Sequence, residues 1–74
     1  MSDVAVIGEH PVVAGFALAG ARVYPAHGPT QVQAAWRALP ETVAIVILTP
    51  AAADAVRGLP TSRHRAPLTV VMPL

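Results

Sequence analysis

The chain has 74 residues and a formal net charge of +1, and 54% of its residues are hydrophobic although only 4% are aromatic. This length predicts one domain over residues 1–74. Because aromatic residues are few, its core is expected to consist of Val, Ile, Leu and Ala. The small net charge disfavours nucleic acid as a partner. All five basic residues are Arg and there is no Cys, which excludes lysine-dependent sites, disulfides and thiolate metal sites.

The apolar stretches give no sign of membrane insertion. Gly, Pro, His or charged residues interrupt each of them well short of the roughly 20 residues that a membrane span needs. The N-terminus also lacks the basic start of a secretory signal. We therefore expect no direct membrane insertion.

Four short apolar segments are predicted to be strands. Residues 4–7 and 43–48 are continuously apolar, which is typical of strands covered on both faces. Residues 21–24 alternate in polarity and meet Pro25, whereas residues 68–72 lie between two prolines. These last two segments are predicted to be edge strands.

Three helices are predicted between the strands. The first begins near His10 with Pro11 at its first turn. Thr30 and Gln33 have capping-box spacing at the start of the second, which Pro40 ends. Thr49 is the expected N-cap of the third, where Asp54 and Arg57 form an exposed i, i+3 pair. The expected core-facing stripes are, in chain order, Val12, Phe16 and Ala19; Val32, Ala35, Trp36 and Leu39; and Ala52, Ala55, Val56 and Leu59.

Alternation of strands and helices predicts an α/β fold with helices on both faces of a parallel sheet. Right-handed crossovers, with the apolar strands central, give a four-stranded, three-layer sheet of order 2-1-3-4, a Rossmann-like or receiver-like topology. Its topological switch point lies between the first and third strands. Any ligand crevice would be there.

That crevice has few residues suited to catalysis or cofactor binding. It would be lined by Gly8, Glu9 and His10 and by Thr49 and Pro50. The glycine spacing of a dinucleotide site and the lysine of a phosphate loop are absent, and Thr49 stands where a receiver domain has its phospho-accepting Asp. We expect no catalytic, cofactor-binding or metal-binding residue.

Other polar residues give weak signals. Glu9 and His10 are adjacent, which seldom lets two side chains converge on one substrate. His10, His27 and His64 fall in separate loops without metal-ligand spacing. The cluster of residues 63–65 lacks the interleaved aromatics of a nucleic-acid site, and Trp36 belongs to a helical stripe.

The order of motifs resembles that of the F subunits of V/A-type ATPases. Residues 4–9 (VAVIGE), followed by residues 15–20 (GFALAG) and Val23-Tyr24, resemble the family's N-terminal signature. Residues 43–53 and 68–73 resemble its later "IxLITexxA" and "PlileIP" segments. The motif residues with expected structural roles are Gly8, Gly15, Phe16, Leu18, Ala19 and Gly20: Gly15 would permit close helix-to-sheet approach, Gly20 a tight helix exit, and Phe16 and Leu18 would pack.

The resemblance implies a non-catalytic rotor subunit of the central stalk, with no cofactor of its own. It would pair with the coiled-coil rotor protein of the stalk (the D subunit), contact other stalk and head subunits, and help couple ATP turnover to rotation and ion transport. It would be cytoplasmic, as a peripheral part of a membrane-bound complex. Family members continue into a helical tail, whereas this sequence stops at Leu74, so a natural short form, a truncated chain and a gene fragment all stay open.

Exposed edges and sparse charge favour a partner that covers apolar surface. The candidate partner-binding residues are Arg22, Tyr24, Arg63, Arg65, Val70 and Met72. The alternative function is a degenerate receiver-like or nucleotide-binding signalling domain, which would bind its ligand near Gly8 and Thr49.

Overall fold

A computed structural model describes residues 3–59 and 67–73. Strands and helices alternate along the chain, as the sequence predicts. In order they are β1 (Asp3–Gly8), α1 (His10–Val13), the 3-10 helix η1 (Ala14–Ala19), β2 (Arg22–Pro25), α2 (Gly28–Arg37), β3 (Val43–Leu48), α3 (Pro50–Val56) and β4 (Leu68–Val71). None of the helices in these residues is long and apolar enough to cross a membrane.

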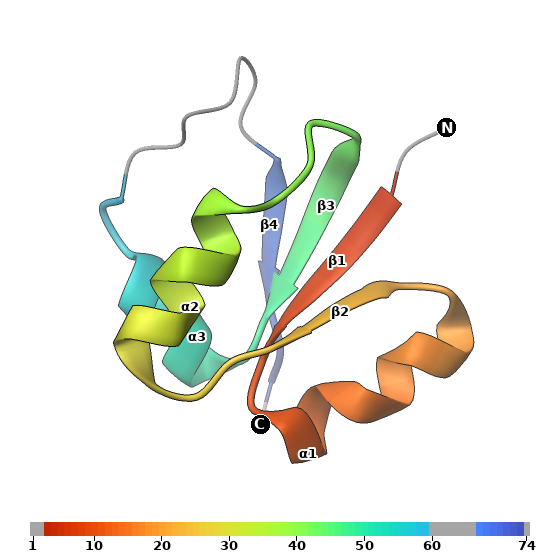
Figure 1. Cartoon of the computed structure of the whole chain (residues 1–74), viewed down its shortest axis with the longest axis horizontal. Coiled ribbons are helices and arrows are strands. Elements are labelled where there is room, and N and C mark those ends of the chain that lie inside the picture. The colour runs from red at the N-terminus through yellow and green to blue at the C-terminus, as the bar shows by residue number, and fades with distance from the viewer. Residues whose placement is uncertain (1–2, 60–66, 74) are drawn as a thin grey trace.

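The four strands form one parallel sheet in the order β2-β1-β3-β4, which confirms the predicted fold class and topology (Figure 1). The two continuously apolar strands occupy the centre because only there do helices and neighbouring strands remove them from water. Ala5, Val6 and Ile7 are wholly buried. The chain thus buries β1 and places β2 and β4 at opposite edges.

The helices are divided unequally between the two faces of the sheet. The right-handed crossover from β1 to β2 runs in the opposite direction along the sheet from the crossovers to β3 and β4, so it places α1 on one face and α2 and α3 on the other. Helices α2 and α3 pack side by side, and α1 with η1 packs against β1 and β2 (Figure 1). The main core cluster lies beneath α2 and α3.

The first helix differs from its prediction. Only one α-helical turn forms, and the chain continues as a 3-10 helix to Ala19. Val13 is wholly buried, whereas Val12 and Phe16 are only half-buried. The predicted stripe therefore omits the most buried residue of α1, and the α-helical spacing on which it relies ends at Val13, where the 3-10 helix begins.

The start of α2 also differs. The helix begins at Gly28, and its N-cap, His27, makes no side-chain capping bond. Instead the Gln31 side-chain oxygen accepts a hydrogen bond from the His27 backbone N–H at 2.8 Å. Pro29 sets the helical backbone before Thr30 is reached, which overrides the predicted capping box. Gln33 donates to the Ala55 carbonyl at 3.1 Å and ties α2 to α3.

The third helix follows its prediction closely. Thr49 caps it by accepting a hydrogen bond from the Ala52 N–H at 3.3 Å. Ala52 and Val56 are buried, and Asp54 and Arg57 form the expected exposed pair at 2.7 Å. A side-chain cap and a proline at the first turn act at the same point, which explains why the sequence located this helix correctly.

Candidate functional site

The crevice at the carboxyl ends of β1 and β3 is filled by the chain's own atoms. Thr49 is wholly buried there, and its N–H donates to the Ile7 carbonyl at 3.2 Å. A Cβ at Gly8 would overlap the Thr49 side chain. Glycine is therefore required at position 8 by close packing, since no other residue leaves room for Thr49.

Glu9 occupies the position in front of α3 where an anionic ligand would sit. The Thr49 hydroxyl donates to the Glu9 carboxylate at 3.0 Å while accepting from the Ala52 N–H. A carboxylate at this point interacts favourably with the positive end of the α3 dipole and repels phosphate. The predicted crevice residues Gly8, Glu9 and Thr49 are thus brought together, but as a closed packing arrangement.

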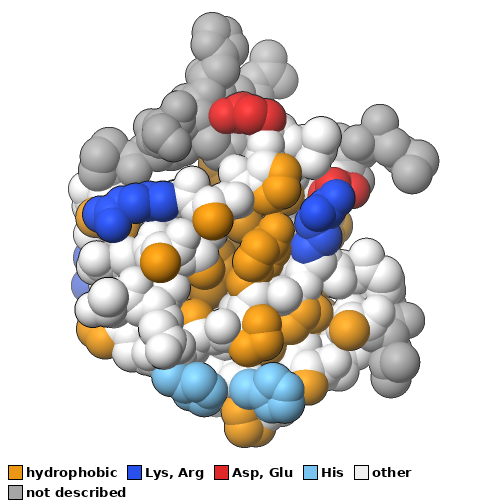
Figure 2. Space-filling view, in the orientation of Figure 1, with side chains coloured by type: hydrophobic (Ala, Val, Ile, Leu, Met, Phe, Trp, Pro, Cys, Tyr) orange, Lys and Arg blue, Asp and Glu red, His pale blue; other side chains and the backbone are white. Residues whose placement is uncertain are grey.

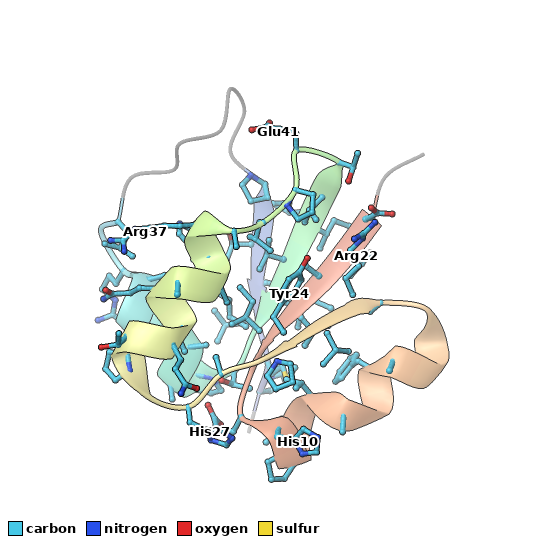
Figure 3. The ribbon with its side chains drawn as sticks, viewed as in Figure 1. His10, Arg22, Tyr24, His27, Arg37 and Glu41 are labelled. Atoms are coloured by element: carbon cyan, nitrogen blue, oxygen red, sulfur yellow. The ribbon has the colours of Figure 1, made fainter. Side chains whose placement is uncertain are left out.

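The two histidines that the structure describes do not form a cluster suited to metal binding. His10 and His27 are both exposed (Figure 3). Among residues 3–59 and 67–73, no group of three or more His, Asp or Glu side chains could hold a metal ion. His64 lies outside the described residues.

The amino end of the sheet carries a polar cluster that the sequence analysis did not identify. The Asp3 carboxylate accepts hydrogen bonds from the Arg22 guanidinium and the Thr42 hydroxyl, both at 3.0 Å. These three residues connect the ends of β1, β2 and the segment before β3. Arg22, a candidate partner-binding residue, is therefore already engaged within the chain, although its side chain is 54% exposed.

Tyr24, on β2 like Arg22, has a different environment. It is half-buried and packs against the main core cluster, as do Ala35 and Trp36 of α2 (Figure 3). Figure 2 shows a band of hydrophobic side chains beside α2 on this face of the molecule. Side chains of β2 and of the neighbouring helix α2 thus cover part of the β2 edge.

The β4 edge is much more open. All four of its residues are exposed, and Leu68, Val70 and Val71 are 64%, 45% and 49% exposed. They are the large hydrophobic residues that the structure shows exposed among the residues it describes. The predicted contact residues Val70 and Met72 belong to this edge, and Met72 is half-buried.

An apolar strip continues from β4 onto the neighbouring face of β3. Ile45 pairs with Leu68 and Ile47 with Val70, so these four side chains share one face of the sheet. Ile45 and Ile47 are half-buried, while α1 and η1 pack against β1 and β2 on the other half of that face. We name residues 45, 47, 68 and 70 the β3–β4 strip. The expectation that β3 is fully covered on both faces is wrong, because no sequence pattern reveals how far α1 reaches.

The candidate partner-binding residues do not converge on one surface. Arg22 and Tyr24 lie on β2, while Val70 and Met72 lie at the opposite edge. Arg63 and Arg65 lie outside the described residues. A single flat partner would therefore contact one pair or the other.

The motif glycines have separate roles. Gly20 ends η1 with a φ of 84°, which confirms the expected tight exit. A Cβ at Gly15 would have open space around it, so the expected close approach there is wrong and belongs to Gly8 instead. Phe16 is half-buried. Leu18 and Ala19 belong to η1, but the structure does not describe their side chains.

Comparison with known proteins identifies one relationship. The model of the family described as ATP synthase (F/14-kDa) subunit matches residues 4–74, which is nearly the whole chain. The search of curated proteins finds no match to the chain.

Proposed function

Because the chain belongs to the family of ATP synthase (F/14-kDa) subunits, we propose that it is a non-catalytic rotor subunit of the central stalk in a V/A-type rotary ATPase. In this role it binds the coiled-coil rotor protein of the stalk and helps couple ATP turnover to rotation and ion transport. It acts in the cytoplasm, as a peripheral part of the membrane-bound complex. Its contribution is a binding surface.

The β3–β4 strip is the observation that carries this proposal. It presents four branched aliphatic side chains and no charge on half of a sheet face whose other half is covered by α1. A helix packs well on such a face, because an aliphatic sheet surface accepts the apolar stripe of an amphipathic helix. A helix of the coiled-coil partner laid along the strip would complete this layer.

The filled crevice argues against the alternative of a receiver-like or nucleotide-binding domain. A phosphate at the start of α3 would have to displace Glu9 from its hydrogen bond with Thr49. Glu9 and a phosphate are both anionic, so the carboxylate repels a phosphate that approaches this point. The two edges therefore offer more to a protein partner than the crevice offers to a nucleotide.

The β2 edge provides a second, smaller contact. Arg22 stays largely exposed while paired with Asp3, so its remaining donors can reach a carboxylate on another subunit. Tyr24 supplies apolar surface beside it. Because β2 and β4 lie at opposite edges of the sheet, the β2 edge contacts a different segment, or a different protein, from the one that binds the β3–β4 strip.

The proposal is tested by co-expressing the chain with the coiled-coil rotor protein encoded in the same genome and analysing the purified mixture by size-exclusion chromatography with light scattering. A one-to-one complex is expected. Val70→Glu should weaken it at least tenfold, because the charge would be buried against the partner's apolar stripe, and a tenfold change corresponds to about 1.4 kcal/mol.

Val71→Glu is the matched control. Val71 lies on the same strand with nearly the same exposure, 49% against 45%, but faces the opposite side of the sheet. The control should retain most of the affinity. Separate elution of the two wild-type proteins would overturn the proposed partner, and equal loss in both variants would overturn its location.

A further inference from the structure

The free edge of β4 presents a short, well-defined set of backbone groups. The Met72 N–H donates to the Leu48 carbonyl at 2.8 Å. Alternate residues of a strand direct their backbone groups to the same neighbour, so Leu68 and Val70 also bond to β3. The N–H and C=O groups of Thr69 and Val71 therefore point away from the sheet.

Within the part of the chain that the structure describes, this edge has neither a charged side chain nor a covering element to prevent strand pairing. Residues 67–73 contain no charged side chain, and the four strand residues are exposed. Natural edge strands are protected by short length, proline, lysine, an inward-pointing charge or a covering element, and β4 has the short length and the flanking prolines but no charge. Pro67 and Pro73 instead limit the segment at both ends, since each occupies an outward-facing position and has no N–H to offer.

We propose that two copies of the chain associate through antiparallel pairing of their β4 strands about Val70. Thr69 of each copy faces Val71 of the other, and the two residues exchange both backbone hydrogen bonds. Val70 faces its own counterpart across the two-fold axis. The result is a continuous sheet of eight strands, four from each copy.

The side chains favour this register because the segment is nearly palindromic about Val70. Leu68 faces Met72 of the other copy, so three apolar pairs form along the face that carries the β3–β4 strip. Pro67 faces Pro73, so the pairing ends at positions where neither copy has an N–H to donate. Shifting the register by two residues would leave part of each apolar segment unpaired.

A second copy suits this edge better than a charged partner strand. The segment is uncharged and the chain carries a net charge of only +1, so two copies meet with little repulsion. Antiparallel pairing of identical strands also closes by two-fold symmetry, which stops further growth at this edge. A parallel arrangement would not close.

The dimer is expected to be weak. Four strand residues span about 13 Å, so pairing along them buries much less than the roughly 800 Å² per partner of a standard interface. We expect a reversible monomer–dimer equilibrium in the micromolar range or weaker. It does not depend on the proposed function, because it uses the backbone edge of β4 whereas the coiled-coil rotor protein would use the face.

Sedimentation equilibrium of the full chain over a wide concentration range tests the proposal. Thr69→Pro removes an outward N–H that the β3–β4 ladder does not use, and it should shift the protein to monomer, with at least a tenfold weaker association. Thr69→Ala keeps that N–H and should associate as the wild type does. Association unchanged in Thr69→Pro, or a wild type that stays monomeric at millimolar concentration, would overturn the proposal.

Cysteine crosslinking tests the register even if Thr69→Pro fails to fold. The chain has no native Cys, so Val70→Cys introduces a single thiol. Facing residues at a non-hydrogen-bonded antiparallel site have Cα atoms about 4.5 Å apart, within the range of a disulfide. Oxidation should crosslink most of Val70→Cys and little of Thr69→Cys. The reverse pattern, or no crosslink in either, would contradict pairing about Val70.

Discussion

The crevice between β1 and β3 and the edge of β4 are opposite in character. In the crevice, Thr49 is wholly buried, fills the space that Gly8 leaves and bonds to Glu9. At the edge, Leu68 and Val71 are about half or more exposed. The site where folds of this topology usually bind ligands is closed, and the apolar surface lies at the periphery. The contrast agrees with the proposed function, in which the domain acts through a binding surface.

Gly8→Ala should have the largest effect on stability. The added methyl group would overlap Thr49, and overpacking a closed interior costs about 1–3 kcal/mol of unfolding free energy. Urea denaturation followed by circular dichroism would measure the loss.

Gly15→Ala provides the control for that experiment. A Cβ at Gly15 meets nothing within 4 Å, and its φ is not positive. Its stability should be unchanged or higher by up to about 1 kcal/mol, because alanine favours helical backbone. Equal losses in the two variants would contradict the tight packing of the crevice.

Thr49→Val should have an intermediate effect. It preserves the shape of the side chain but removes the cap of α3 and the bond to Glu9, which should cost about 1–2 kcal/mol. The same substitution at Thr30, which is exposed, should change stability by less than about 0.5 kcal/mol. Thermal unfolding of the two variants would show whether Thr49 caps α3 and whether Thr30, as the sequence predicted, caps α2. A similar loss at both positions would show that Thr30 caps α2 after all.

Val71→Thr should have the smallest effect. Its side chain is half exposed, so adding a hydroxyl should change the unfolding free energy by less than about 0.5 kcal/mol in dilute solution. Val46→Thr makes the same change at a wholly buried position of the adjacent strand and should cost about 1–3 kcal/mol. Comparable losses in denaturant titrations would mean that β4 is covered in solution, either by a second copy or by other parts of the chain.

Features governed by local sequence were predicted well. The apolar run of residues 43–48 matches β3 residue for residue, and the Thr49-Pro50 start of α3 was located because a cap and a proline coincide. The capping box at Thr30 failed because Pro29 and Gln31 compete for the same helix start. The 3-10 geometry of η1 has no comparable sequence signal.

The candidate site was predicted only in part. Gly8, Glu9 and Thr49 were placed together because parallel strands end at the same edge of the sheet, but their hydrogen bonding was not foreseen. Ile45 and Ile47 were assigned to a covered strand, and Asp3 was not considered. A continuously apolar strand looks the same in sequence whether one helix or two cover it.

The sequence by itself determined the strand and helix alternation, the sheet order and the family, because hydrophobic periodicity, prolines and short motifs act over a few residues. Tertiary structure decided which glycine is packed against a neighbour, which strand face stays open, and how the two edges differ. These properties depend on helix length and crossover direction across the sheet, and they involve residues about 40 positions apart, as Glu9 and Thr49 are. A local sequence pattern does not show which residues come into contact when they are so far apart in the chain.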